Sequence, residues 1–114
     1  MNSTIVSIDE AASILKILGD KTRLTMLSIL QKQDCCVCEF VEIFQMSQPA
    51  ISQHLRKLRD NGLVKEKRKS QWIIYSLNTE SEYANLVLDL LAHIPDQGFK
   101  LQELEAKGLR ISCE

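Results

Sequence analysis

The chain of 114 residues is the size of one small domain, and its composition of 45% hydrophobic and 25% charged residues argues against intrinsic disorder. Its net charge of −1 excludes a uniformly basic protein, so a nucleic-acid contact would need a local concentration of positive charge. No apolar run approaches ~18 residues, and the N-terminus carries Asp9 and Glu10 rather than a basic segment, so we expect no membrane span, no secretory signal and a cytoplasmic location.

Three helices are predicted at the start of the chain. The apolar positions of the first recur at helical spacing up to Gly19 and are Ala11, Ile14, Leu15 and Leu18. Asp20 is a suitable N-cap for the second helix, whose apolar positions are Leu24, Leu27, Ile29 and Leu30. Asp34 is a suitable N-cap for a third, short helix, which carries Cys35, Cys36 and Cys38 and runs to Phe44.

A turn at Gln45 and Met46 precedes a fourth predicted helix. Ser47 is a good N-cap residue, and Pro49 in the first turn needs no partner for its missing N–H group. Asn61 and Gly62 form a C-cap signal. The apolar face of this helix is Ile51, Leu55 and Leu58, and the other face shows Gln48, Ser52, Gln53, Arg56 and Lys57.

The hydrophobic period then changes to that of a β-hairpin. Leu63 and Val64 begin one strand, residues 67–71 are polar and turn-like, and residues 72–77 are rich in the β-branched and aromatic residues of a returning strand. Residues 56–69 hold seven basic and two acidic side chains, whereas the other 100 residues hold seven basic and thirteen acidic. Charge alone would equally fit a solvated helix end followed by a charged turn.

Thr79 and Glu82 have the spacing of a capping box at the start of a last helix. Its wide apolar stripe stops at Pro95 and consists of Tyr83, Leu86, Val87, Leu90, Leu91 and Ile94. We therefore divide the chain into one folded domain over residues 1–95 and a tail over residues 96–114. The tail has weak helical spacing at Leu101 and Leu104, and the sequence leaves its role open.

A short helix, a tight turn, a capped second helix and a basic hairpin, in this order, predict a winged helix-turn-helix in a mainly α fold. The N-terminal residues of a recognition helix face base edges, so we expect Ser47, Gln48, Ser52 and Gln53 to read bases. The expected phosphate contacts are Arg56, Lys57, Lys67, Arg68 and Lys69. His54 is either a further phosphate contact or a solvated surface histidine.

The residues that build this unit resemble the ArsR/SmtB family of metalloregulatory repressors. The matching runs are residues 20–24 (DKTRL), 36–40 (CVCEF), 47–55 (SQPAISQHL), Leu58, 61–64 (NGLV) and 72–77 (WIIYSL). The resemblance covers roughly residues 10–94 and implies a homodimeric repressor that leaves its operator DNA when an inducer binds. It also implies a dimer interface made by the first and last helices, which agrees with the wide apolar stripe. A two-fold dimer predicts an inverted-repeat operator.

Three of the four cysteines, Cys35, Cys36 and Cys38, lie within four residues. In a reducing compartment they are better explained as ligands or sensors than as disulfides, and soft thiolates select soft metals. The Cys36-Val37-Cys38 pair resembles the arsenic-responsive branch of the family, which implies As(III) or Sb(III) as the inducer, with Cd(II), Pb(II) and Zn(II) as alternatives. Some relatives have a third cysteine where Val41 stands, so three alternatives stay open for the third thiolate: Cys35, Cys113 if the tail folds back or crosses the dimer, or none.

The local backbone decides which thiols can act together. On a helix, positions i and i+3 lie about 60° apart, so Cys35 and Cys38 would share a face, whereas an extended segment would bring Cys36 and Cys38 to the same side. All three bind one ion only if the helix start distorts, and that distortion would weaken DNA binding. We also expect the helix N-terminus to lower the thiol pKa.

Other functions compete with this one. A thiol redox sensor of the same fold would release DNA when a disulfide forms. A zinc site on the last helix would use Asp89 and His93, but the Asp-x-His and His-x-x-His/Glu arrangement of the zinc-sensing branches is absent. A thiol-disulfide oxidoreductase would need a βαβ context around its Cys-x-x-Cys, and a dimeric scaffold would have no salt-dependent DNA affinity. We therefore expect no enzyme activity and no permanent cofactor.

Overall fold

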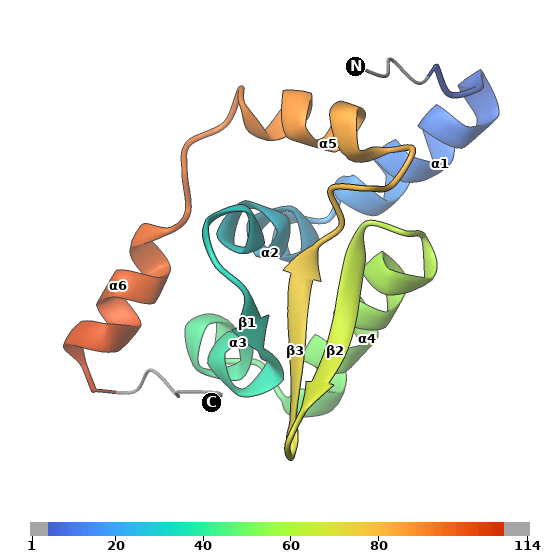
Figure 1. Cartoon of the computed structure of the whole chain (residues 1–114). Helices are drawn as coiled ribbons and strands as arrows, with labels where there is room; N and C mark the ends of the chain where they lie inside the picture. The colour runs from blue at the N-terminus through green and yellow to red at the C-terminus, as the bar shows by residue number, and fades with distance from the viewer. Residues whose placement is uncertain (1–4, 109–114) are drawn as a thin grey trace.

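The computed structural model describes residues 5–108, and Figure 1 shows how their helices surround a small sheet. The helices are α1 (Ile8–Leu18), α2 (Lys21–Lys32), α3 (Val37–Phe44), α4 (Gln48–Asp60), α5 (Ala84–Leu91) and α6 (Phe99–Ala106). The strands β1 (Cys35–Cys36), β2 (Val64–Lys69) and β3 (Trp72–Leu77) form one antiparallel sheet in the order β1-β3-β2. The predicted fold class, mainly helical with a basic β-hairpin after a helix-turn-helix, is confirmed.

The first two helices lie where the sequence predicts them because side chains satisfy their free N–H groups. At the start of α1, the Glu10 N–H donates to Ser7 Oγ at 3.0 Å and the Ser7 N–H donates to Glu10 Oε1 at 3.1 Å. At the start of α2, the Arg23 N–H donates to Asp20 Oδ1 at 3.0 Å. Within the predicted stripe of α1, Leu15 is 49% exposed, so one apolar side chain points away from the core.

The segment that carries the thiols differs from the prediction. Asp34 does not cap a helix that contains all three cysteines, because Cys35 and Cys36 form the strand β1 and α3 begins only at Val37. Pairing with β3, where Cys35 faces Tyr75 and Cys36 faces Ile74, gives this backbone the hydrogen-bond partners that a helix turn would have supplied. The Cys36 N–H then donates to the buried Glu39 carboxylate at 2.9 Å, which fixes the start of α3.

The helix-turn-helix forms as predicted. Gln45 ends α3 in the left-handed conformation, with φ 54°, and the chain turns directly into α4. Ser47 caps α4 by accepting the Ala50 N–H at 3.3 Å. At its other end, Gly62 adopts φ 77°, a conformation that favours glycine and lets the chain leave the helix for β2.

The hairpin, hereafter the wing, is longer than predicted. Residues 67–69 belong to β2 instead of a loop, since Lys69 pairs with Trp72 across the ladder, and the turn consists of Ser70 and Gln71 alone. Ser70 takes φ 59° there, as a tight hairpin turn requires. The basic residues of the wing therefore follow the alternation of a strand.

The capping box predicted from Thr79 and Glu82 does not form, and α5 starts only at Ala84. Two short-range hydrogen bonds hold this stretch in turns instead, from the Glu80 N–H to Asn78 Oδ1 at 3.1 Å and from the Tyr83 N–H to Ser81 Oγ at 3.0 Å. Beyond Pro95 the chain folds back along α2 and α3. The helix α6 buries Leu101 and Leu104, each 4% exposed, in agreement with the weak helical spacing of the tail.

The core lies between α2, α4 and the sheet, with Met26, Leu27 and Ile29 of α2 at its centre, each 0% exposed. Figure 1 shows α2 at the upper end of the sheet, α5 and α1 above it, and the wing tip at the lower end of the molecule. Within residues 5–108, no helix combines the length and the apolar character needed to cross a membrane.

Candidate nucleic-acid interface and thiol pocket

The inner face of α4 is fixed by burial, which leaves a polar face outside. Ile51, Leu55 and Leu58 are each 0% exposed and anchor the helix in the core, as predicted. The residues predicted to read bases are exposed or half-buried at the start of the helix and on its outer side: Ser47, Gln48, Ser52 and Gln53. This is the placement that base reading in a major groove requires, and we refer to α4 as the recognition helix.

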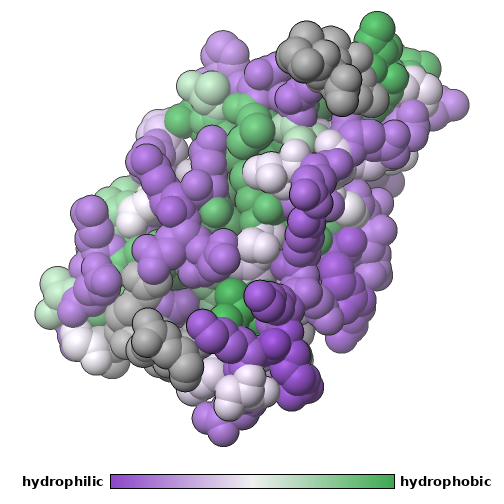
Figure 2. Space-filling view, in the orientation of Figure 1, coloured by the Kyte–Doolittle hydropathy of each residue, from purple (hydrophilic) through white to green (hydrophobic). Residues whose placement is uncertain are grey.

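Ion pairing divides the basic residues of positions 56–69 into two groups. Arg59 pairs with Asp60 and Glu66, and Lys65 pairs with Glu80 at 2.8 Å. The other five are exposed and form no ion pair within residues 5–108: Arg56, Lys57, Lys67, Arg68 and Lys69. These five are the predicted phosphate contacts. Figure 2 shows strongly hydrophilic side chains gathered at the lower end of the molecule, where the wing lies in Figure 1.

The two faces of β2 distribute the charges of the wing. Val64 is buried, and Glu66 and Arg68 follow it on the same side, which faces the recognition helix. Lys67 and Lys69 point to the opposite side. The sequence predicts residues 67–71 to be a turn-like segment, in which Arg68 and the two lysines would not alternate between two faces. The wing therefore presents exposed basic side chains on both of its faces.

His54 is tied to α2 rather than freely solvated. Arg23 Nη1 lies 3.2 Å from His54 Nδ1, and Arg23 Nε donates to the Ile17 carbonyl at 2.9 Å. The Asp20 carboxylate that caps the same helix has a lowered pKa, chiefly because it accepts the Arg23 backbone N–H. Arg23 thus connects the end of α1, the start of α2 and the recognition helix, a role that sequence reasoning missed. The predicted phosphate contact of His54 stays a prediction.

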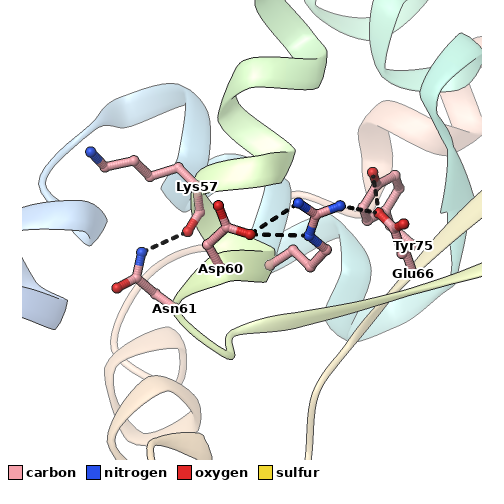
Figure 3. A network of polar contacts seen from close by, with 6 residues as sticks. Lys57, Asp60, Asn61, Glu66 and Tyr75 are labelled. Carbon is pink, nitrogen blue, oxygen red and sulfur yellow. Dashed lines mark hydrogen bonds and ion pairs between the residues drawn. The ribbon is translucent and has the colours of Figure 1, made fainter.

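A second polar network joins the recognition helix to the sheet (Figure 3). Arg59 donates from Nε and Nη2 to Asp60 Oδ1 at 3.2 and 3.0 Å, and from Nη1 to Glu66 Oε1 at 2.9 Å. The Tyr75 hydroxyl donates to the same Glu66 oxygen at 2.9 Å. These donors lower the pKa of Glu66, and burial together with the Glu66 contact raises the pKa of Tyr75 to about 12. No local sequence pattern predicts this network, because its members lie on three elements.

The structure brings Cys36 and Cys38 together and places Cys35 apart from them. Cys35 is 1% exposed within the hydrophobic core, and its Sγ donates to the Gln33 carbonyl at 3.6 Å. Cys36 follows it in a strand and so points to the opposite face, where its side chain contacts that of Cys38. The expectation that Cys35 and Cys38 share a helix face is wrong, and the extended alternative describes the segment.

Cys36 and Cys38 line a surface pocket of about 330 Å³. The pocket is bounded by the start of α3, the start of the recognition helix, and the wing turn with the start of β3. Its lining residues are Cys36, Val37, Cys38, Gln48, Gln71, Trp72 and Ile73. The pocket thus borders both the two thiols and the first residue of the recognition helix.

The pKa of Cys38 is raised, because burial disfavours the thiolate and the neighbouring Cys36 thiol adds to the effect. The expectation that the helix start lowers the thiol pKa is therefore wrong for Cys38. Its own backbone contact does lower the pKa, but burial outweighs it. Cys38 is accordingly a protonated thiol at neutral pH, and a ligand has to displace that proton.

Within residues 5–108, no group of three histidine, cysteine or acidic side chains has the geometry of a metal site. Asp89 lies exposed on α5, and His93 lies exposed just beyond it. Cys113, the other candidate third thiol, lies outside the described residues. Within the described residues, the soft donors that line the pocket are therefore the two thiols of Cys36 and Cys38. The predicted third ligand Cys35 stays a prediction that requires β1 to rearrange.

Sequence and structure comparisons show which known proteins this chain is similar to. Residues 20–66 match the family model described as "Bacterial regulatory protein, arsR family". The chain is 36% identical to the "Arsenical resistance operon repressor" of Staphylococcus xylosus, over 89% of this chain and 97% of that protein. It is 33% identical to the "Transcriptional repressor SmtB homolog" of Synechocystis sp., over 81% of this chain and 71% of that protein. Among solved structures, the transcriptional repressor BigR from Xylella fastidiosa is 34% identical with a TM-score of 0.65, covering 74% of this chain and 82% of that one.

Proposed function

The chain belongs to the ArsR family of bacterial regulatory proteins and is a transcriptional regulator rather than an enzyme, and we propose that it is a homodimeric repressor released from its operator when a trivalent metalloid binds Cys36 and Cys38. One observation carries the proposal, namely the pocket that holds both thiols and borders Gln48 of the recognition helix. A ligand bound there contacts the DNA-reading unit directly. A regulator with free thiols would work in the cytoplasm, where cysteines stay reduced.

DNA binding is assigned to the exposed face of α4 and to the wing. Ser47, Gln48, Ser52 and Gln53 would read base edges in the major groove. Phosphate contacts would come from His54 and from the five exposed basic residues that form no ion pair within residues 5–108, and these contacts would make the affinity dependent on salt. A dimer would place two such units on an inverted repeat, with half-sites about 34–36 Å apart.

The donor set favours arsenite or antimonite. At neutral pH, arsenite is the neutral acid As(OH)₃. Two As–S bonds form as two As–O bonds break, each thiol proton leaves with a hydroxyl group as water, and the oxidation state of arsenic does not change. The third As–O bond remains, or Cys35 replaces it if β1 leaves the sheet. The name of the Staphylococcus relative supports this inducer class.

A divalent inducer, Cd(II), Pb(II) or Zn(II), fits the two thiols less well. A divalent cation must displace the thiol protons into solution, and the raised pKa of Cys38 opposes this displacement. Such a cation also needs further ligands, whereas the pocket borders only two thiols among its lining residues.

The dimer interface is assigned to α1 and α5. Ile8 and Leu15 of α1 are 84% and 49% exposed, and within the apolar stripe of α5 Leu86 and Leu90 are half-buried. Figure 2 shows apolar surface toward this end of the molecule, opposite the wing. Exposed apolar residues on adjacent helices are what an interface between two copies would bury.

Direct ligand binding tests the site. Trp72 is the single tryptophan of the chain and lines the pocket, so its fluorescence should change when arsenite is added to the reduced protein. Cys36→Ser or Cys38→Ser should abolish that change, whereas Cys35→Ser should keep a two-thiol signal. An unaltered signal in the Cys36→Ser/Cys38→Ser variant would contradict the site.

A redox sensor is the second candidate, and the contact between the Cys36 and Cys38 side chains favours it. The Cys-x-x-Cys pair that the sequence suggested is separated by the strand, so an oxidant would act on Cys36 and Cys38 instead. Forming a disulfide would pass two electrons and two protons to that oxidant. Release of DNA by oxidant, with no effect of arsenite under reducing conditions, would select this function.

A further inference from the structure

Glu66 Oε1 receives two hydrogen bonds from different parts of the fold (Figure 3). The Tyr75 hydroxyl donates from β3 at 2.9 Å, and Arg59 Nη1 donates from the recognition helix at 2.9 Å. Asp60 holds the other side of the same guanidinium group. Arg59 is therefore committed to the protein, and its contacts fix the end of the recognition helix against the wing.

The same network lies in register with the thiol segment. Tyr75 pairs with Glu66 of β2 on one side and with Cys35 of β1 on the other. Residues that face one another in an antiparallel ladder point to the same side of the sheet. Cys35, Tyr75 and Glu66 thus form one row across all three strands, which ends at Arg59 of the recognition helix.

The row is closely packed at its thiol end. Cys35 and Tyr75 are 1% and 7% exposed and belong to one hydrophobic core. Because protein interiors are close-packed, a shift of β1 cannot be absorbed by empty space around Tyr75. Cys36, whose side chain lines the pocket, directly follows Cys35 in the two-residue strand β1, so we expect a displacement of Cys36 to shift Cys35 as well.

We propose that Tyr75 is a positioning residue that transmits ligand binding at Cys36 and Cys38 to the recognition helix through its hydroxyl contact with Glu66 and Arg59. This inference rests on the proposed function. A ligand that draws Cys36 toward Cys38 shifts β1 on β3, and Tyr75 shifts with its partner strand. The Glu66–Arg59 contact then changes, and with it the position of the recognition helix relative to the wing.

The quantity to measure is the coupling ratio, the dissociation constant for operator DNA with saturating arsenite divided by that without it. Tyr75→Phe keeps the buried ring and removes the hydroxyl. We expect arsenite to bind the free variant as it binds the wild type, by Trp72 fluorescence, and the coupling ratio to fall about fivefold, the typical value of one hydrogen bond. Glu66→Gln, at a partly exposed position, should lower the ratio in the same direction.

Glu80→Gln is the matched control. It removes one negative charge, as Glu66→Gln does, and it also breaks an ion pair of β2, the contact of Glu80 with Lys65 at 2.8 Å. Glu80 is not part of the Tyr75 row. Removing one negative charge should change DNA affinity similarly in both Gln variants. We expect the coupling ratio of Glu80→Gln, however, to equal that of the wild type.

The possible outcomes separate the two proposals. A wild-type protein that arsenite does not release contradicts the proposed function itself. A wild type that is released, with an unchanged coupling ratio in Tyr75→Phe and Glu66→Gln, overturns this inference and leaves the function standing. Equal weakening of DNA binding with and without arsenite would show a static brace and would also overturn it.

Discussion

Gln48, the first residue of the recognition helix, lines the same pocket as Cys36, which ends β1. Twelve positions separate the two residues in the chain, and the turn after α3 brings them to one surface. A ligand held by the thiols therefore lies beside a side chain expected to read DNA. Under the proposed function, inducer and DNA would both use this pocket, so by linkage DNA should weaken inducer binding as much as inducer weakens DNA binding.

Gln53 is exposed on the outer face of the recognition helix, and we expect Gln53→Ala to weaken operator binding by about 1–3 kcal/mol, the value of a good base contact. Binding to unrelated DNA should change less, because phosphate contacts remain. Competition titrations with the two DNAs measure the difference. Gln31→Ala, at an exposed glutamine of α2, is the control, and equal losses on both DNAs would remove Gln53 as a base reader.

The wing should contribute to the salt dependence of DNA binding. Arg68→Ala with Lys69→Ala removes two exposed charges without ion pairs in the described part of the chain, and we expect the slope of log K against log salt to fall by about 1.8. Lys65→Ala is the control, because Lys65 already pairs with Glu80 and should change the slope less. An unchanged slope in the double variant would exclude the wing from the interface.

The pH dependence of inducer binding should identify the inducer class. Burial raises the pKa of Cys38, so the thiol is protonated at neutral pH and gives up its proton only on binding. Affinity for a divalent cation should then rise with pH, by about tenfold per pH unit for each proton displaced, up to the pKa of the thiol. Affinity for As(OH)₃ should stay constant over the same range, because each thiol proton leaves as water.

Titrations of Trp72 fluorescence with arsenite and with Cd(II) measure how each affinity depends on pH. A range of about pH 6 to 8 is suitable, because it lies below the ordinary thiol pKa. If arsenite affinity rose with pH as steeply as Cd(II) affinity, arsenite binding would release protons into solution. That result would contradict the proposal that each thiol proton leaves as water.

The helix α6 should contribute to stability, although it belongs to the tail. Leu104 is 4% exposed, and Leu104→Ala should lower the free energy of unfolding by about 2–5 kcal/mol, the usual cost of removing a buried leucine side chain. Urea unfolding measures the loss, with the exposed Gln102→Ala as the control. A Leu104→Ala variant as stable as the wild type would show that α6 does not pack stably on the domain.

Local signals predicted much of this fold, and long-range pairing accounts for what they missed. Asp20 and Ser47 cap their helices as predicted, since a cap depends on residues three positions away. Asp34 looked equally suitable, but the residues after it pair with β3, forty positions along the chain, and no local rule contains that partner. The buried face of the recognition helix was predictable from its period, whereas the capture of Arg59 by Glu66 was not.

The same contrast holds for the candidate site. The cysteine motif predicts that thiols form the site. The alternation of side chains along β1, however, is what places Cys35 on one face and Cys36 on the other, beside Cys38. Likewise, the basic character of the wing is predictable from its composition, whereas the two faces on which its charges lie follow from the register of β2 with β3.

The most direct test of the account is a titration of the reduced protein, bound to a fluorescent duplex from its own upstream DNA, with arsenite while anisotropy reports release. The Cys36→Ser/Cys38→Ser variant, measured alongside, should bind the DNA and stay bound. Release of the wild type alone is the predicted result. Release of both proteins, or of neither at arsenite concentrations that saturate the Trp72 signal, would contradict the claim that these two thiols control operator binding.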